Sequence, residues 1–186
     1  AGIGDFKLSP DESKVMYVSY IHSDVKQPSD TDPKLDKATA YVAEDLMYRH
    51  WDHWVTELPH TFIADFGEGI SPEKSIDILA SEDKLYELPT EPFGGMEQLD
   101  WSPDGKYIAY SCKKKAGKEY AFSTNTEIYI YNVADGSCNV IPMGGGYDTE
   151  PTWSPDGQHI AWLSMARDGY AADKARLVVA DVADGK

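Results

Sequence analysis

The side chains with the clearest potential for chemistry are histidines and carboxylates between positions 50 and 60. His50, His53 and His60 alternate there with Asp52 and Glu57, and histidines three residues apart share one face of a helix. A zinc site normally needs a third ligand and a partner that orients each imidazole. The spacing offers no such complete set. We therefore interpret these groups as hydrogen-bonding surface residues and predict no metal and no other cofactor.

Motifs that activate a catalytic nucleophile are missing from the sequence. α/β-Hydrolases hold their reactive serine on a Gly-x-Ser-x-Gly turn, and this chain contains no such segment. Ser154 and Ser164 occur in turn and strand contexts instead. Gly144–Gly146 precedes neither Lys-Ser/Thr nor a helix start, so we interpret it as a connector and not as a phosphate loop. The chain is predicted to supply no catalytic residue.

Composition and charge exclude further classes of function. Hydrophobic residues make up 41% of the 186 positions, which is enough for a buried core, and the formal net charge is −15. Nucleic-acid surfaces need clustered Lys and Arg, whereas the only basic run is Lys113–Lys115, interpreted as a solvated loop tip. No apolar run approaches the ~20 residues of a membrane span. We expect neither a nucleic-acid partner nor a membrane span.

The elements that must position any functional group are set by a repeat. Ser-Pro-Asp begins at Ser9, Ser102 and Ser154, each time between two strand-like segments. Pro suits the second position of a type I turn, and Ser can bond back to the backbone. Gly105 and Gly157 then fit the left-handed conformation that closes the hairpin. The first copy has Glu12 there, at a cost of roughly 1–2 kcal/mol, so we predict a looser turn.

A third strand follows each hairpin and ends, in the last two copies, at Ala-Asp-Gly. The strands are expected at 127–133 and 177–182, and a fourth at 138–141. Four antiparallel strands repeated every ~40–50 residues indicate a propeller blade. We predict an all-β partial β-propeller of about three four-stranded blades: blade 1–90, blade 96–143 and an incomplete blade 147–186.

The first blade is predicted to contain a long, partly helical insertion at residues 22–60, between its second and third strands. Asp32-Pro33 has the residue types of a helix start, with an N-cap and Pro at the first helical position. An amphipathic helical stripe is then expected from the spacing of Met47, Trp51, Trp54, Val55 and Leu58. Elsewhere, Cys112 and Cys138 fall at opposite ends of one sheet, roughly 20 Å apart, so two free thiols are expected.

Several segments give the chain a family resemblance. They are Tyr48–Trp54, Lys113–Lys115 with Glu119–Ala121, Ser123–Asn125, Ala166–Tyr170 and Ala172–Lys174. On these segments the chain resembles the propeller of the prolyl oligopeptidase family of serine peptidases. Within that family it is most similar to the dipeptidyl-peptidase V and acylaminoacyl-peptidase-like branch.

The resemblance implies a parent enzyme whose C-terminal α/β-hydrolase domain, absent from this chain, carries a Ser-Asp-His triad and releases short units from peptide N-termini. The propeller would gate and orient peptide substrates, would be inactive alone, and would be periplasmic or secreted. A stand-alone periplasmic propeller that scaffolds protein complexes is the alternative. Sequence beyond Lys186 distinguishes the two, because further blades followed by a nucleophile elbow identify the enzyme.

The loops after each second strand are the predicted binding surface. These loops should lie on one face of a propeller, where binding residues concentrate. An exopeptidase must hold the ammonium group of its substrate, and a desolvated carboxylate does this well. The leading carboxylates are Glu119 and Asp168, and the further candidates are Tyr120, Tyr170, Arg49 and Asp52.

Overall fold

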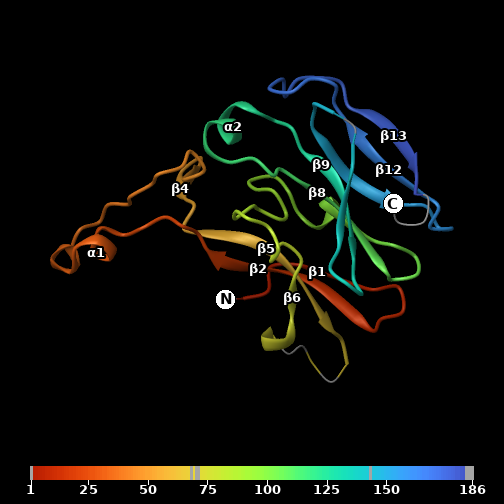
Figure 1. Cartoon of the computed structure of the whole chain (residues 1–186), viewed down its shortest axis with the longest axis horizontal. Coiled ribbons are helices and arrows are strands. Elements are labelled where there is room, and N and C mark those ends of the chain that lie inside the picture. Colours follow the sequence, from red (N-terminus) through yellow and green to blue (C-terminus); the bar gives the residue numbers. More distant parts are fainter. Residues whose placement is uncertain (1, 68, 70–71, 143, 183–186) are drawn as a thin grey trace.

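The computed structural model describes residues 2–67, 69, 72–142 and 144–182. These residues form three larger antiparallel sheets that lie side by side (Figure 1) and one small two-stranded sheet. The first sheet contains, in spatial order, β1 (Phe6–Leu8), β2 (Lys14–His22), β5 (Glu57–Asp65) and β6 (Ile76–Asp77). The second contains β10 (Cys138–Ile141), β9 (Glu127–Asn132), β8 (Tyr107–Cys112) and β7 (Leu99–Trp101). The third contains β11 (Asp148–Trp153), β12 (His159–Ser164) and β13 (Arg176–Asp181).

These sheets confirm the predicted all-β fold, a partial propeller with antiparallel blades. The expected outer strand at 138–141 coincides with β10. The expected Ala-Asp-Gly turn at 183–185 lies outside the described residues. In the part of the chain that the structure describes, no helix combines the length and apolar character needed to cross a bilayer.

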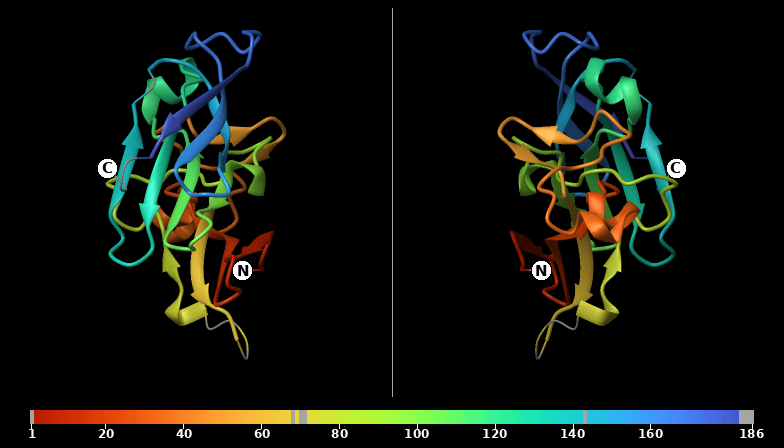
Figure 2. Two further views of the ribbon diagram at one scale, coloured as in Figure 1. Left: turned by 90° about the vertical axis from the view of Figure 1, so that its right-hand side faces the viewer. Right: turned by 90° about the vertical axis from the view of Figure 1, so that its left-hand side faces the viewer.

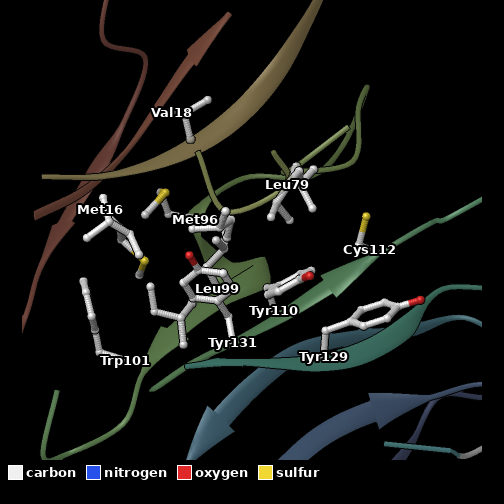
Figure 3. Packing of buried hydrophobic residues seen from close by; sticks show 14 of the residues in the cluster. Met16, Val18, Leu79, Met96, Leu99, Trp101, Tyr110, Cys112, Tyr129 and Tyr131 are labelled. Carbon is white, nitrogen blue, oxygen red and sulfur yellow. The ribbon is translucent and has the colours of Figure 1, made fainter. Parts of the chain in front are cut away.

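Alternation along the strands lets the second sheet pack against a neighbour on each face. Ile108 and Tyr110 of β8 point toward the first sheet, while Ala109 between them points toward the third. Figure 3 shows the first of these interfaces, which includes Met16, Val18, Leu79, Met96, Leu99, Trp101, Tyr110 and Tyr131. The second interface contains Ile128, Ile130, Trp153, Ile160 and Trp162. The second sheet therefore buries apolar side chains against a neighbour on each face, as expected for stacked repeats.

Residues 78–98 form a connector from the outer strand of the first sheet to the inner strand of the second. The 3₁₀ helix η2 (Pro72–Lys74) precedes β6, and η3 (Met96–Gln98) ends the connector just before β7. Leu88 is completely buried, and its N–H donates to the carbonyl of Pro59 at 2.8 Å. The hydroxyl of Thr61 donates to the carbonyl of Leu88 at 3.0 Å. These bonds hold the connector against β5.

The insertion occupies residues 23–56, shorter than the expected 22–60, because β2 extends to His22 and β5 starts at Glu57. It contains α1 (Pro28–Thr31) and the 3₁₀ helix η1 (Pro33–Leu35). Asp32 caps η1 as predicted, and its carboxylate accepts from the N–H of Lys34 at 3.0 Å. Figure 1 shows the part of the insertion around α1 projecting away from the second and third sheets.

The prediction of an amphipathic helix over residues 47–58 is wrong. The segment forms a two-stranded hairpin, β3 (Arg49–His50) with β4 (His53–Trp54). Val55 and Leu58 are buried, whereas the Trp51 side chain at the hairpin tip is exposed, so the five residues do not share one face. The aromatic and β-branched content of the segment favours strands, and the pairing Arg49↔Trp54 overrides the helical spacing.

The Ser-Pro-Asp turns have one geometry in all three blades. In each, the N–H three residues after the serine donates to the serine carbonyl at 2.9 Å, and the serine hydroxyl donates to the aspartate. Gly105 and Gly157 have φ of 69° and 70°, and Glu12 has φ of 57°. The looser turn expected for the first copy is therefore wrong, because Glu12 adopts the left-handed conformation with the same hydrogen bonds. Cys112 and Cys138 are free thiols, as predicted.

Replacing either turn glycine by a β-branched residue should destabilise the fold. We expect Gly105→Val and Gly157→Val each to lower the free energy of unfolding by roughly 1–2 kcal/mol, since left-handed φ is unfavourable for such residues. A Cβ at Gly105 would meet its nearest atom, Pro10 Cδ, at 3.8 Å, so crowding is not the cause. Urea unfolding measures the loss, and unchanged midpoints would contradict the assigned turn geometry.

Glu12→Gly should have the opposite effect. Glycine removes the cost of a left-handed residue, about 1–2 kcal/mol, while its greater freedom in the unfolded chain offsets about 0.4–1 kcal/mol. We therefore expect a net gain of roughly 0.5–1 kcal/mol in the same unfolding experiment. A lower midpoint for Glu12→Gly would show that the first turn is held by contacts of the Glu12 side chain.

Candidate functional site

Loops from all three blades meet on one face of the molecule. Figure 2 shows the hairpin of β3 and β4, the helix α2 (Gly117–Phe122) and the loop after β12 on the same side. The carboxylate of Asp45 accepts from the N–H of Gly117 at 2.9 Å and 3.0 Å, which joins the insertion to the second blade. The carboxylate of Asp168 accepts from the N–H of Thr124 at 2.7 Å, which joins the second blade to the third.

A buried carboxylate of the connector lies where these loops converge. Glu87 is 2% exposed, and its Oε1 lies 2.5 Å from Nε2 of His50 on β3. Its other oxygen, Oε2, accepts a hydrogen bond from the Tyr120 hydroxyl on α2 at 3.0 Å. Both carboxylate oxygens are therefore bonded, one to the insertion and one to the second blade.

A second connector carboxylate, Glu91, stands next to the first. The nitrogen of His50 and one oxygen each of Glu87 and Glu91 all lie within 4.8 Å of one another. Glu91 is half-buried, and its Oε1 accepts from the Tyr20 hydroxyl of β2 at 3.0 Å. Among the described residues, His50, Glu87 and Glu91 are a group with ligand atoms close enough to hold a metal ion.

The pKa values of His50, Tyr120 and Tyr20, the neighbours of the two carboxylates, are shifted in the direction that keeps their protons in place. The hydrogen bond to Glu87 raises the pKa of His50 above its ordinary value of 6.5, and burial opposes this shift. Burial raises the pKa of Tyr120 and that of Tyr20, so both hydroxyls stay protonated and donate to the carboxylates. Glu87 and Glu91 therefore place two acceptor groups beside one imidazole, and the nearby ammonium group of Lys113 offsets part of their negative charge.

Lys113 supplies the nearest further positive charge, and its position corrects the expectation for the run Lys113–Lys115. Lys113 Nζ donates to the carbonyl of Tyr120 at 2.7 Å and lies 4.0 Å from the centre of its ring. Lys114 Nζ lies 2.5 Å from Glu82 and 3.8 Å from the ring centre of Tyr129. The interpretation as a solvated loop tip is wrong, because the ammonium groups of Lys113 and Lys114 lie over aromatic rings and also have polar partners.

The two leading carboxylates from the sequence occupy different surroundings. Glu119 is exposed on α2 and lines a hollow of about 370 Å³ together with Phe122 and Asp168. Asp168 accepts hydrogen bonds from the Ser123 hydroxyl and from the N–H groups of Thr124 and Asn125. The bond from Ser123 is the main cause that lowers the pKa of Asp168. Asp168 therefore serves chiefly to connect two blades.

The remaining predicted residues divide between the cluster and its surroundings. Tyr120 donates a hydrogen bond to Glu87 and so belongs with His50, Glu87 and Glu91 to one group of side chains, here called the Glu87 cluster. Tyr170 is exposed, and the guanidinium of Arg167 lies over its ring at 4.0 Å. Arg49 lies 5.6 Å from the ring centre of Trp54. Asp52, on the hairpin tip, is bonded by His53 at 3.3 Å, and this bond lowers its pKa. The described partners of these three side chains are residues other than Glu87.

Glu87 and Glu91 were not predicted as site residues, because they lie on the connector between two blades and not on a loop after a second strand. The usable signal was the apolar surroundings of Glu87 in Leu85–Pro89, since an isolated carboxylate in an apolar segment is seldom buried without a specific partner. The interpretation of His50 as a surface residue is wrong, because its side chain is buried and bonds to Glu87, 37 residues away along the chain.

The His50–Glu87 pair should make stability depend on pH. A raised pKa means that the folded state holds the proton more tightly, so the stabilisation is complete below about pH 6.5 and is lost as pH rises through the folded pKa. We expect His50→Gln to lose most stability, relative to wild type, at low pH. Urea unfolding at several pH values measures this, with the exposed His53→Gln as control. A difference that grows with pH would contradict the assignment.

No family model matches the chain. Its sequence is 49% identical to dipeptidyl-peptidase 5 of Porphyromonas gingivalis over 187 residues, covering all of this chain and 27% of that protein. The dipeptidyl-peptidase 5 of Porphyromonas endodontalis is 41% identical, with 95% of this chain and 25% of that protein covered. For the dipeptidyl-peptidase 5 of Arthroderma otae the identity is 30%, covering 97% and 27%.

Among solved structures, a putative TolB of Agrobacterium tumefaciens aligns with 94% of this chain and 43% of its own, with 16% identity and a TM-score of 0.49. The sequence matches confirm the resemblance to the dipeptidyl-peptidase V branch. By sequence, the chain is a full-length match to one segment of the dipeptidyl-peptidase 5 proteins, and it spans about a quarter of the length of these relatives.

Proposed function

We propose that this chain is the non-catalytic propeller portion of a periplasmic or secreted serine exopeptidase of the dipeptidyl- or aminoacyl-peptidase type. In this proposal it gates and orients peptide substrates for an α/β-hydrolase domain of the same parent chain, and it is inactive alone. The similarity to dipeptidyl-peptidase 5 proteins supports the peptidase. The absence of a Gly-x-Ser-x-Gly segment from these 186 residues supports a non-catalytic role.

The observation that carries the proposal is the pair of carboxylates on the connector. Glu87 is fully engaged by His50 and Tyr120, whereas for Glu91 one hydrogen bond, from Tyr20, is described. Glu91 is also the more exposed of the two. It therefore retains acceptor capacity for an incoming ammonium group, with Glu87 supplying additional negative charge behind it.

Glu91 fits the amine better than the two carboxylates favoured by the sequence. Asp168 already accepts several hydrogen bonds from the second blade. Glu119 lies on an exposed surface, where water weakens a charge–charge contact. A carboxylate that is partly withdrawn from water binds an ammonium more strongly, provided that its own desolvation is compensated. Tyr20 provides that compensation at Glu91.

A scaffold that only assembles other proteins is the competing function. Its binding surface needs no internal charge cluster, because interaction surfaces are built mainly from exposed apolar and polar side chains. The Glu87 cluster combines a buried carboxylate, an imidazole and a phenol within the loop layer, which favours recognition of a small charged group.

Glu91→Gln should reduce activity of the full-length protein selectively on substrates with a free amino terminus. A charge-assisted hydrogen bond contributes about 1.5–3 kcal/mol, so we expect kcat/KM on dipeptidyl chromogenic substrates to fall roughly 10- to 150-fold. N-acetylated substrates should lose much less. Glu119→Gln and Asp168→Asn are assayed in parallel. If either shows the selective loss and Glu91→Gln does not, the amine site lies at that residue.

A further inference from the structure

Two large aromatic side chains, Trp51 and Phe93, are exposed close in sequence to members of the Glu87 cluster. Trp51 is 70% exposed and Phe93 is 76% exposed. Their ring centres are 5.0 Å apart with an interplanar angle of 74°, an edge-to-face contact. Exposed aromatic surface of this size is unfavourable in water, and where it is concentrated it commonly marks a binding site.

Trp51 also has an unusual backbone conformation. It is the first residue of the two-residue loop between β3 and β4 and has φ of 44°. Hairpin loops of this length normally place glycine, asparagine or aspartate at such a position, because a left-handed φ is costly for a bulky residue. The large side chain is thus kept at a strained, exposed loop tip, a combination found where function requires the residue.

Trp51 and Phe93 lie on the two segments that the Glu87 cluster brings together, which are the β3–β4 hairpin and the connector. Trp51 directly follows His50, and Phe93 comes two residues after Glu91. His50 and Glu91 are held within 4.8 Å by their polar atoms, so the cluster brings the hairpin tip and the connector together. The ring contact between Trp51 and Phe93 bridges the same two segments on the solvent side.

This juxtaposition determines what the pair would bind. In a peptide, the side chain of the first residue departs from the carbon that carries the ammonium nitrogen. A substrate whose ammonium is held by Glu91 therefore has its first side chain close to the anchor. Two exposed rings offer that side chain an apolar surface, and their faces also attract the ammonium group.

We propose that Trp51 and Phe93 form the subsite for the side chain of the substrate's amino-terminal residue, and that this subsite favours aromatic and branched aliphatic residues. The inference rests on the proposed function, since it requires the ammonium group to bind at Glu91. The class of substrate is thus a peptide with a free amino terminus and a large apolar first residue.

The experiment uses the full-length protein and dipeptidyl chromogenic substrates that differ only in the first residue, which is Phe, Leu or Gly. In Trp51→Ala and Phe93→Ala, the ratio of kcat/KM for Phe over Gly should fall about tenfold, because apolar pockets contribute selectivity of this order. Activity on the Gly substrate should fall much less than activity on the Phe substrate, because glycine places no side chain against the rings. Trp51→Phe should recover most of the ratio, since it keeps an aromatic ring.

Phe122→Ala is the matched control, because Phe122 is equally exposed at 77% but lies on α2 in the neighbouring hollow. It should leave the ratio unchanged. The inference is overturned if the Phe/Gly ratio is unaffected by both aromatic variants. It is also overturned by an equal loss on all three substrates, which would indicate that the pair packs against another part of the full-length protein.

The two proposals fail in distinguishable ways. If Glu91→Gln removes the preference for free-amine substrates while Trp51→Ala and Phe93→Ala keep the preference for Phe, the subsite is wrong and the amine anchor stands. If the Glu91→Gln variant keeps the full preference for free-amine over acetylated substrates, Glu91 does not bind the amino group. The proposed subsite is then also wrong, because it depends on that contact.

Discussion

The carboxylate of Glu87 imposes the central constraint on the loop face. A carboxylate that is 2% exposed needs hydrogen bonds for both of its oxygens, and removing one partner of a buried charged pair costs about 3–5 kcal/mol. The partners come from different parts of the chain, namely His50 from the insertion and Tyr120 from α2. The hairpin, the connector and α2 therefore adopt their positions together. These loops contain little regular secondary structure. The hydrogen bonds of Glu87 therefore hold them in place, as the hydrogen bonds between strands hold a sheet.

The sheets beneath provide the rigid support that such a cluster requires. Each strand of the second blade presents one set of side chains to the first blade and the other set to the third. The packing between the sheets therefore sets the distances between the ends of β2, β8 and β12, independently of the loops that follow these strands. Polar loops then need only a few strong contacts to become ordered, which is consistent with the small number of carboxylate bonds that join them.

The blades could be predicted from the sequence because their signals are local. Ser102–Gly105 specifies its turn through residues a few positions apart, and the strands on either side alternate with period two. The hairpin at Arg49–Trp54 was mistaken for a helix because its aromatic residues match both periods, and only pairing across the turn decides between them. The contact of His50 with Glu87 depends on the path of the connector between two blades, and no local pattern reports that path.

The bonds of Asp45 to Gly117 and of Asp168 to Thr124 have a consequence for how the blades can be exchanged. Each is a carboxylate from an outer blade that accepts hydrogen bonds from backbone N–H groups in a loop of the second blade. The sheets alone suggest interchangeable modules, since their turns share one geometry. A chimaera that replaces a single blade would, however, leave either a loop without its acceptor or an aspartate without its donors. A functional exchange of a blade must consequently carry with it the loops of its neighbours to which it is bonded.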